Sequence, residues 1–136
     1  MRLFRIPGSV ALLAVSLMPL AHAEEATQER LCGWYENPTP RVINLIDHEG
    51  SWKVATADGY SAPGQKPIFR ASQWIRTNGD YGYGCACLSG DIDEQTHTVN
   101  AIATATARTL AACRSDASLR EPSELKGKNV VGAIVM

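Results

Sequence analysis

Four cysteines constrain the fold of this 136-residue chain more than any other feature of its sequence. They are Cys32, Cys85, Cys87 and Cys113, so two of them are separated by a single residue. The close pair could be a redox site, a metal site, or two half-cystines with different partners. The compartment decides among these, because disulfides persist in oxidising compartments and are rare in the cytosol.

The N-terminus predicts export from the cytosol. The chain begins MRLFR, continues with an apolar run over residues 10–20, and reaches the small-residue triplet AHA at 21–23. A basic head, an apolar middle and a small-residue exit are the three parts of a secretory signal peptide. The run is shorter than the roughly 20 apolar residues of a spanning helix. We therefore predict a signal peptide over 1–23, and a mature product that is periplasmic or secreted and not stably inserted in a membrane.

In an exported chain, an even number of cysteines indicates a disulfide framework. A direct Cys85–Cys87 bond is disfavoured, because residues two apart on a strand lie about 6.5–7 Å apart, at the outer limit for a disulfide. Cys32 then pairs with one of the two, and Cys113 with the other. We favour Cys32–Cys87 with Cys85–Cys113, and the reverse pairing stays open. Each bridge closes a long loop and would contribute about 3–4 kcal/mol.

The predicted mature chain, residues 24–136, has the size of one domain and a formal charge of −3. Nucleic-acid binding requires a basic face, and the scattered charges of this chain provide none. They give no reason to expect an anionic membrane surface as a partner either.

Short β-branched and apolar segments between turn residues predict a mainly β domain. VINLID and WKVATA, joined by HEGS, form a β-hairpin pattern, and Asn78-Gly79 is a turn signal. The pattern favours a small antiparallel barrel or sandwich of about five or six short strands, with its core over about residues 31–120. The predicted strands are 30–35, 42–47, 52–57, a segment around Trp74-Ile75, 81–93 and 98–109.

The segments between the strands give further expectations. NPTPR at 37–41 predicts a stiff connector, and 58–67 a long loop, because proline fixes φ and glycine breaks strands. A minor helical turn is expected within 110–122, with Ser115 or Asp116 as its cap. The apolar tail after Lys128 is either a last strand or an adhesive terminus.

Residues 81–93 alternate in an informative way. Tyr81, Tyr83 and both cysteines of the close pair fall on one face of the predicted strand, and Gly82 and Gly84 fall on the other. Interior glycines weaken a strand. We expect them where another backbone or side chain lies close against the strand, or at a bulge.

Several pieces of the sequence occur together: CGWYENPTP, QWIRTNGDYGYGCACL and LAACRSDASL. With them, the chain resembles a family of short exported bacterial proteins, domain of unknown function 4087, over roughly residues 31–120. The resemblance implies export and a four-cysteine framework. It implies no established activity, so no catalytic residue is carried over from it.

The sequence predicts no enzyme, no cofactor and no metal site. His48 lies between two acids at the hairpin turn, and His97 lies in a second turn, so solvated turns are favoured over acid–base roles. The sequence lacks the H-E-x-x-H, G-x-S-x-G, P-loop and paired C-x-x-C motifs.

A binding role is the function that the sequence favours. Aromatic and amide side chains next to stiff backbone are typical of a peptide or glycan contact surface. Core packing is the competing interpretation, and it is favoured for Trp52 and Trp74.

We predict a non-catalytic module that binds an unknown protein or a cell-envelope glycan. The alternative is an envelope protein for thiol redox chemistry or a soft metal such as Cu(I), acting through Cys85 and Cys87. The candidate binding residues are Trp34, Tyr35, Asn37, Tyr81 and Tyr83.

Overall fold

The computed structural model describes residues 8, 11, 13–18 and 28–122. The predicted cleavage site after Ala23 and the apolar tail after Lys128 lie outside these residues. Within them, no helix is both long and apolar enough to cross a membrane. The elements are β1 (Glu29–Thr39), β2 (Val42–Asp47), β3 (Gly50–Ala55), the 3-10 turn η1 (Ala71–Gln73), β4 (Trp74–Asn78), β5 (Tyr81–Asp93), β6 (Thr98–Arg108) and α1 (Leu110–Arg114).

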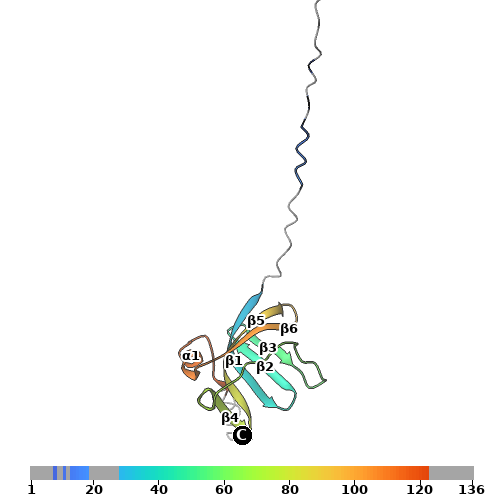
Figure 1. Cartoon of the computed structure of the whole chain (residues 1–136). Coiled ribbons are helices and arrows are strands. Elements are labelled where there is room, and N and C mark those ends of the chain that lie inside the picture. Colours follow the sequence, from blue (N-terminus) through green and yellow to red (C-terminus); the bar gives the residue numbers. More distant parts are fainter. Residues whose placement is uncertain (1–7, 9–10, 12, 19–27, 123–136) are drawn as a thin grey trace, which may run out of the picture.

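The strands form a mainly β barrel (Figure 1). The order is β1-β2-β3-β6-β5, and β5 pairs with β1 again, which closes the sheet on itself. The β4 strand pairs with the first residues of β5, on the edge of β5 that faces away from β1. β1 to β3 form a meander, and a long connection then brings β5 back beside β1, which is a Greek key. With the parallel β3–β6 pair, this is the strand arrangement of OB-type barrels, and such a shared architecture does not identify function.

Residues 61–63 fill the gap between β3 and β6, which meet at only one residue pair. The Ala62 N–H donates to the Val54 carbonyl, and the Ile102 N–H donates to the Pro63 carbonyl, both at 2.8 Å. This segment therefore connects the two strands by hydrogen bonds. From there the chain continues through residues 64–70 to η1 and β4.

Two apolar clusters lie on opposite faces of the sheet. Inside the barrel, Trp52 and Val54 of β3 are buried, as the alternation of that strand predicts. The buried members of this inner cluster are Leu31, Tyr35, Leu45, Trp52, Val54, Ala62, Ala86, Leu88, Val99 and Ile102. The second cluster, called here the outer cluster, consists of Trp34, Tyr83, Cys85 and Cys113, with partly buried residues of α1 and its flanks packed against it.

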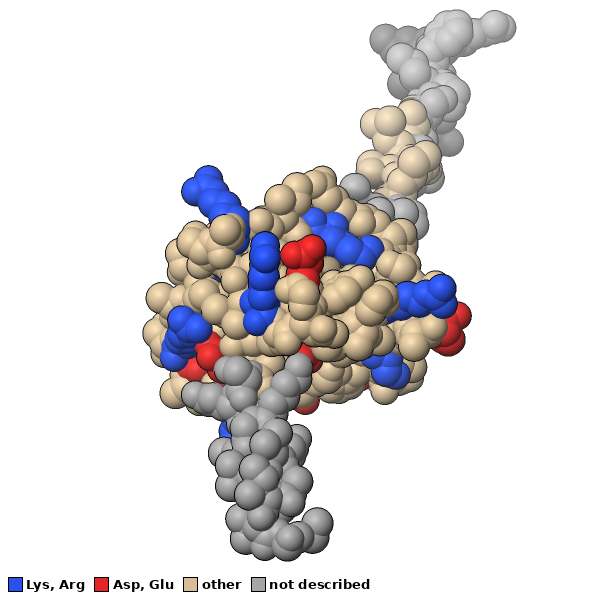
Figure 2. All heavy atoms as spheres, turned by 90° about the horizontal axis from the view of Figure 1, so that it is seen from below, with Lys and Arg blue, Asp and Glu red and all other residues tan. Residues whose placement is uncertain are grey.

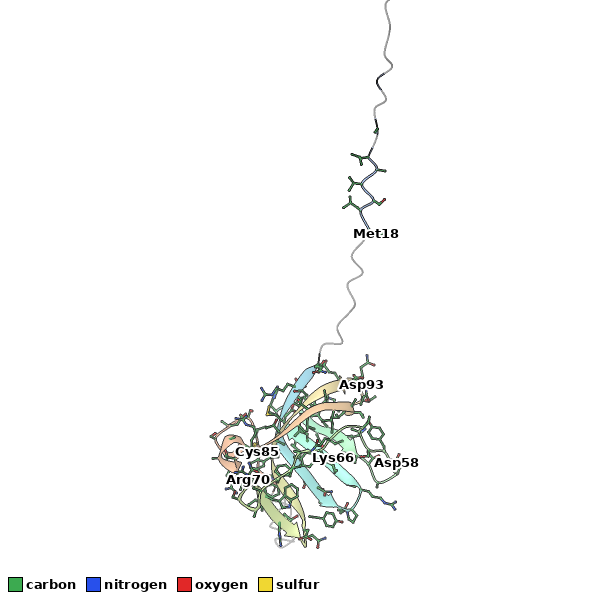
Figure 3. All side chains as sticks on the ribbon, in the orientation of Figure 1. Met18, Asp58, Lys66, Arg70, Cys85 and Asp93 are labelled. Carbon is green, nitrogen blue, oxygen red and sulfur yellow. A yellow bond between two sulfur atoms is a disulfide. The ribbon has the colours of Figure 1, made fainter. Side chains whose placement is uncertain are left out.

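Both disulfides have the favoured pairing, Cys32–Cys87 and Cys85–Cys113. Cys32 and Cys87 lie directly opposite each other on β1 and β5. Cys85 lies near the middle of the domain in Figure 3, and its bond to Cys113 joins β5 to α1. The disulfides connect the barrel wall to itself and to the helix.

Two local predictions are wrong. Residues 37–39 continue β1 instead of starting a connector. The pairing of β1 with β2 shifts register between Glu36 and Thr39, so the missing N–H of Pro38 falls at an irregularity where it is tolerated. The N-cap of α1 is Thr109, because the helix begins at Leu110, and Ser115 is its C-cap instead.

Candidate functional site

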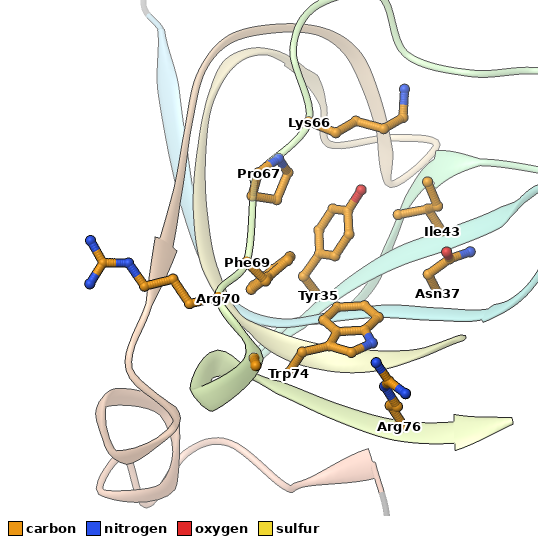
Figure 4. Close-up of a pocket in the computed structure, with 10 residues that line it drawn as sticks. Tyr35, Asn37, Ile43, Lys66, Pro67, Phe69, Arg70, Trp74 and Arg76 are labelled. Carbon is orange, nitrogen blue, oxygen red and sulfur yellow. The ribbon is translucent and has the colours of Figure 1, made fainter. Parts of the chain in front are cut away.

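A pocket of about 780 Å³ lies at the end of the barrel where β1 passes into β2 (Figure 4). Ligand sites for small molecules typically have about 300–1,000 Å³. Strands β1, β2 and β4 and the segment before β4 supply its walls. The lining residues are Tyr35, Asn37, Ile43, Lys66, Pro67, Phe69, Arg70, Ala71, Trp74 and Arg76.

Three aromatic rings form one continuous surface of this pocket. The ring centroids of Tyr35 and Phe69 are 5.6 Å apart, and those of Phe69 and Trp74 are 4.8 Å apart, with the rings tilted by 42° and 44°. The indole Nε1–H of Trp74 donates to the Asp80 carbonyl at 3.0 Å, which fixes the ring against the β4–β5 turn. Aromatic pairs in this distance range attract each other beyond the area they bury. The surface is thus held in place without a ligand.

The glycines of β5 make room for this surface. A Cβ at Gly84 would lie 2.6 Å from the Phe69 ring and 2.6 Å from the Gln73 carbonyl oxygen. A Cβ at Gly82 would lie 1.8 Å from the Ile75 carbonyl oxygen of β4. The expectation that interior glycines mark a close approach is therefore confirmed. The consequence for the pocket is that Phe69 packs directly on the β5 backbone.

Two polar groups of β1 face the pocket. The Asn37 side-chain amide donates to the carbonyls of Thr39 and Val42, both at 2.8 Å, which leaves its Oδ1 as an acceptor. The Tyr35 hydroxyl points toward the side of the pocket where Lys66 stands (Figure 4). Burial raises the pKa of Tyr35 above its ordinary value, so the hydroxyl stays protonated at neutral pH. The pocket thus offers one acceptor and one hydroxyl.

The charged groups of the pocket are all basic. Lys66 is half-buried, whereas Arg70 and Arg76 are exposed. Arg76 forms a salt bridge of 3.6 Å with Asp80, and the two side chains are 73% and 91% exposed. Exposed pairs of this kind contribute at most about 1 kcal/mol. The Arg76 guanidinium is therefore weakly held.

The structure divides the five predicted binding residues. Tyr35 and Asn37 line the pocket. Trp34 and Tyr83 are 0% and 1% exposed and pack edge-to-face in the outer cluster, with centroids 5.4 Å apart. Tyr81 is half-buried at the start of β5 and does not line the pocket. Trp34 and Tyr83 thus belong to the outer cluster and not to the pocket, in which Tyr35 itself is 4% exposed.

Sequence reasoning missed several pocket residues. The sequence pattern assigns Trp74 to the core, although it is half-buried and forms part of the aromatic surface. Lys66 and Phe69 lie in or beside a predicted loop to which no function is given. A signal was present: Gly84 faces the pocket side of β5, and an aromatic residue would fill the space that it leaves.

Both histidines lie at turns, away from the pocket. His48 is exposed and 3.6 Å from Glu49. The His97 ring stacks on Trp52, with centroids 4.2 Å apart. All four cysteines are in disulfides, so the structure holds no thiolate at Cys85 or Cys87 that could bind Cu(I).

The chain belongs to the family described as Protein of unknown function (DUF4087), whose family model matches residues 26–120. The matched range includes all four cysteines and the complete pocket lining. No curated protein and no solved structure matches this chain.

Proposed function

We propose that this protein is a non-catalytic binding module of the bacterial envelope, periplasmic or secreted, that holds a segment of a glycan in the barrel-end pocket. The observation that carries the proposal is the continuous surface of Tyr35, Phe69 and Trp74 inside a cavity of suitable size. The flat, electron-rich face of an aromatic ring attracts the C–H groups of a sugar ring.

The polar groups support a glycan over a peptide. Oδ1 of Asn37 accepts and the Tyr35 hydroxyl can donate or accept, and both are side-chain groups suited to sugar hydroxyls. Because neighbouring backbone carbonyls fix the Asn37 amide, its acceptor is already oriented before a ligand arrives. Preorganisation of this kind reduces the entropy cost of binding.

The disulfide framework supports the envelope location. Two bridges in a short chain are typical of proteins that work outside the cytosol. The redox alternative through Cys85 and Cys87 has less support, since these cysteines are 2% and 4% exposed and are therefore poorly accessible to a thiol partner.

The indole proton of Trp74 provides the test. The ¹⁵N-labelled protein is titrated with tetragalacturonate and with chitotetraose while the Trp74 Nε1–H resonance is followed. We expect at least one oligosaccharide to shift this resonance. Calorimetric titration, which does not depend on the Trp74 signal, should then show that Trp74→Ala weakens that binding about tenfold or more, as for loss of a central aromatic contact.

The matched control is Ile68→Ala, because Ile68 lies on the same segment, is 75% exposed and does not line the pocket. It should bind as the native protein does. The proposal fails if neither oligosaccharide shifts the Trp74 resonance, or if Ile68→Ala loses binding to the same extent as Trp74→Ala. Binding of envelope peptides with the same loss in Trp74→Ala would replace the glycan by a peptide ligand.

A further inference from the structure

The two ends of the barrel differ in charge. The described part from residue 28 to 122 contains nine Lys or Arg and eleven Asp or Glu residues, so it is net acidic. The pocket nevertheless has three basic lining residues and no acidic one. In Figure 2, blue Lys and Arg side chains are spread over the face seen from below, and smaller red patches of Asp and Glu lie beside several of them.

Six of the eleven acids lie toward the opposite end, where β1 starts and the β2–β3 and β5–β6 turns lie: Glu29, Asp47, Glu49, Asp91, Asp93 and Glu94. Asp93 marks this end in Figure 3, and Lys66 and Arg70 lie away from it. One small cavity there has four acids in its lining, Glu29, Asp47, Glu49 and Glu94, together with Arg30 and His48. The pKa of Glu29 is raised by loss of hydration first, and then by Glu94, Glu49 and Asp91. A ligand with negative charge would be repelled from this end and attracted to the pocket.

Two cations stand on either side of the aromatic surface. Lys66 lies above the Tyr35 hydroxyl, and Arg76 lies beyond the Trp74 ring on the other side (Figure 4). Arg70 points away from the cavity and is not used in the argument. The salt bridges found among the described residues do not include Lys66, so its ammonium is available. Arg76 can exchange its exposed partner Asp80 for a ligand at little cost.

From this arrangement we propose that the glycan is acidic: its ring stacks on Phe69 and Trp74, and a carboxylate or phosphate on it binds Lys66, with Arg76 available to a second acidic group. The inference rests on the proposed function and adds the charge of the ligand to it. A charge-assisted hydrogen bond in a half-buried site is stronger than a neutral one, so the acidic group should dominate selectivity.

The experiment compares ligands that share their sugar rings and differ in whether an acidic group is present. Tetragalacturonate and its methyl ester have the same sugar rings, and phosphorylated maltotetraose against maltotetraose gives the corresponding phosphate pair. We expect each acidic ligand to bind about tenfold more tightly than its neutral counterpart at low salt, and the better acidic ligand identifies the acid group. The preference should shrink as NaCl is raised to about 0.3 M.

The variants assign the preference to residues. In the double variant Lys66→Ala/Arg76→Ala, the acidic and the neutral ligands should bind with similar affinity. Lys66→Arg should keep most of the preference for the acidic ligand. Lys53→Ala is the matched control, because Lys53 is an exposed lysine of β3 that does not line the pocket. Lys53→Ala should leave the affinities for all four sugars unchanged.

The two proposals fail in different ways. If the ester and the unphosphorylated sugar bind as tightly as the acids, the ligand is not selected by charge. If the double variant keeps the preference, Lys66 and Arg76 are not the groups that select the acid. In both cases the proposed function stands. If none of the four sugars shifts the Trp74 resonance but chitotetraose does, the acidic ligand is wrong and the proposed function stands. If chitotetraose does not shift it either, both proposals fail.

Discussion

Trp34 and Tyr35 are neighbours on β1, and they belong to two different parts of the molecule. Trp34 points outward into the outer cluster, where it is fully buried beside Tyr83 and the Cys85–Cys113 bond. Tyr35 points inward, and at the end of the barrel it forms one wall of the pocket with Phe69 and Trp74. The outer cluster is closed by a covalent bond and a helix, whereas the aromatic surface of the pocket stays open.

The difference teaches that aromatic residues in this chain have two separate tasks. The outer cluster fixes α1 to the barrel, and the cavity beside it, lined among others by Trp34 and Cys113, has about 330 Å³ and is smaller than the barrel-end pocket. The pocket rings pack against each other at tilts of 42° and 44° and line a cavity of about 780 Å³. Changes in the outer cluster should therefore affect stability, and changes in the pocket should affect binding.

The largest expected effect comes from removing the disulfide of the outer cluster. The chain-entropy model gives about 3.5 kcal/mol for the 28-residue separation of Cys85 and Cys113 and about 4 kcal/mol for the 55-residue separation of Cys32 and Cys87. Cys85 and Cys113 are both buried in the outer cluster, so replacing both by alanine also removes packing. We expect the total cost to be about 4–5 kcal/mol.

Urea unfolding measures these costs, and the double alanine variant of Cys32 and Cys87 is the control. Chain entropy alone makes the control the more damaging change, whereas packing in the outer cluster reverses the order. Amide exchange over residues 110–121 should accelerate only when Cys85 and Cys113 are replaced. The comparison of the two regions breaks down if the control costs more and exchange over 110–121 stays slow in both.

The second prediction concerns Trp34. Trp34→Ala should destabilise the domain by about 3–5 kcal/mol, because a large, fully buried side chain leaves a cavity. Trp34→Phe should cost much less, since the buried Trp34 Nε1–H has no hydrogen-bond partner among the residues that the structure describes. Trp74→Ala, on the half-buried ring of the pocket, is the contrasting variant and should cost clearly less than Trp34→Ala.

Thermal and urea unfolding of the three variants check this. Equal destabilisation by Trp34→Ala and Trp74→Ala would show that the pocket rings are core residues. The separation of tasks between the two regions would then be wrong.

The third prediction concerns Gly84, the backbone position on which the pocket ring of Phe69 packs. Gly84→Ala should cost about 1–3 kcal/mol and displace Phe69, because the added Cβ would overlap both that ring and the Gln73 carbonyl. Unfolding measurements on Gly84→Ala, Phe69→Ala and the double variant form a double-mutant cycle. We expect the double variant to be less destabilised than the sum of the single ones. Additive costs would mean that the ring does not depend on the glycine.

Much of the fold could be predicted from local patterns. The β2–β3 hairpin follows from β-branched residues on both sides of a glycine turn, and β5 follows from the alternation of residues 81–93. The disulfide pairing could be narrowed but not decided, because strand alternation places Cys85 and Cys87 on one face and leaves their distant partners open.

The site could be predicted only in part, because it is built by a long-range contact. The sequence identifies Tyr35 and Asn37 as candidates from their position beside prolines. It cannot tell that Trp34, one residue earlier, is covered by α1, which lies more than 70 residues further along the chain. Nor can it place Phe69 over Gly84, since residues 64–70 form no regular element whose periodicity would orient the ring.

The smallest expected effect is on how the folding stability changes at alkaline pH, and it concerns Tyr35 of the pocket. Burial raises the pKa of the Tyr35 hydroxyl in the folded state above its value of about 10 in the unfolded chain. The stability that this provides is fully present below about pH 10 and is lost as the pH rises toward the folded pKa, because the unfolded chain releases its proton first. Native protein should therefore lose stability above about pH 10, and Tyr35→Phe should lose less over the same range.

Urea midpoints measured from about pH 8 to about pH 11 test this, with Tyr60→Phe as the control tyrosine. Identical alkaline slopes for the native protein and Tyr35→Phe would mean that the hydroxyl is hydrated in the empty pocket, and the pocket wall would then be more open than the packing of Tyr35 indicates.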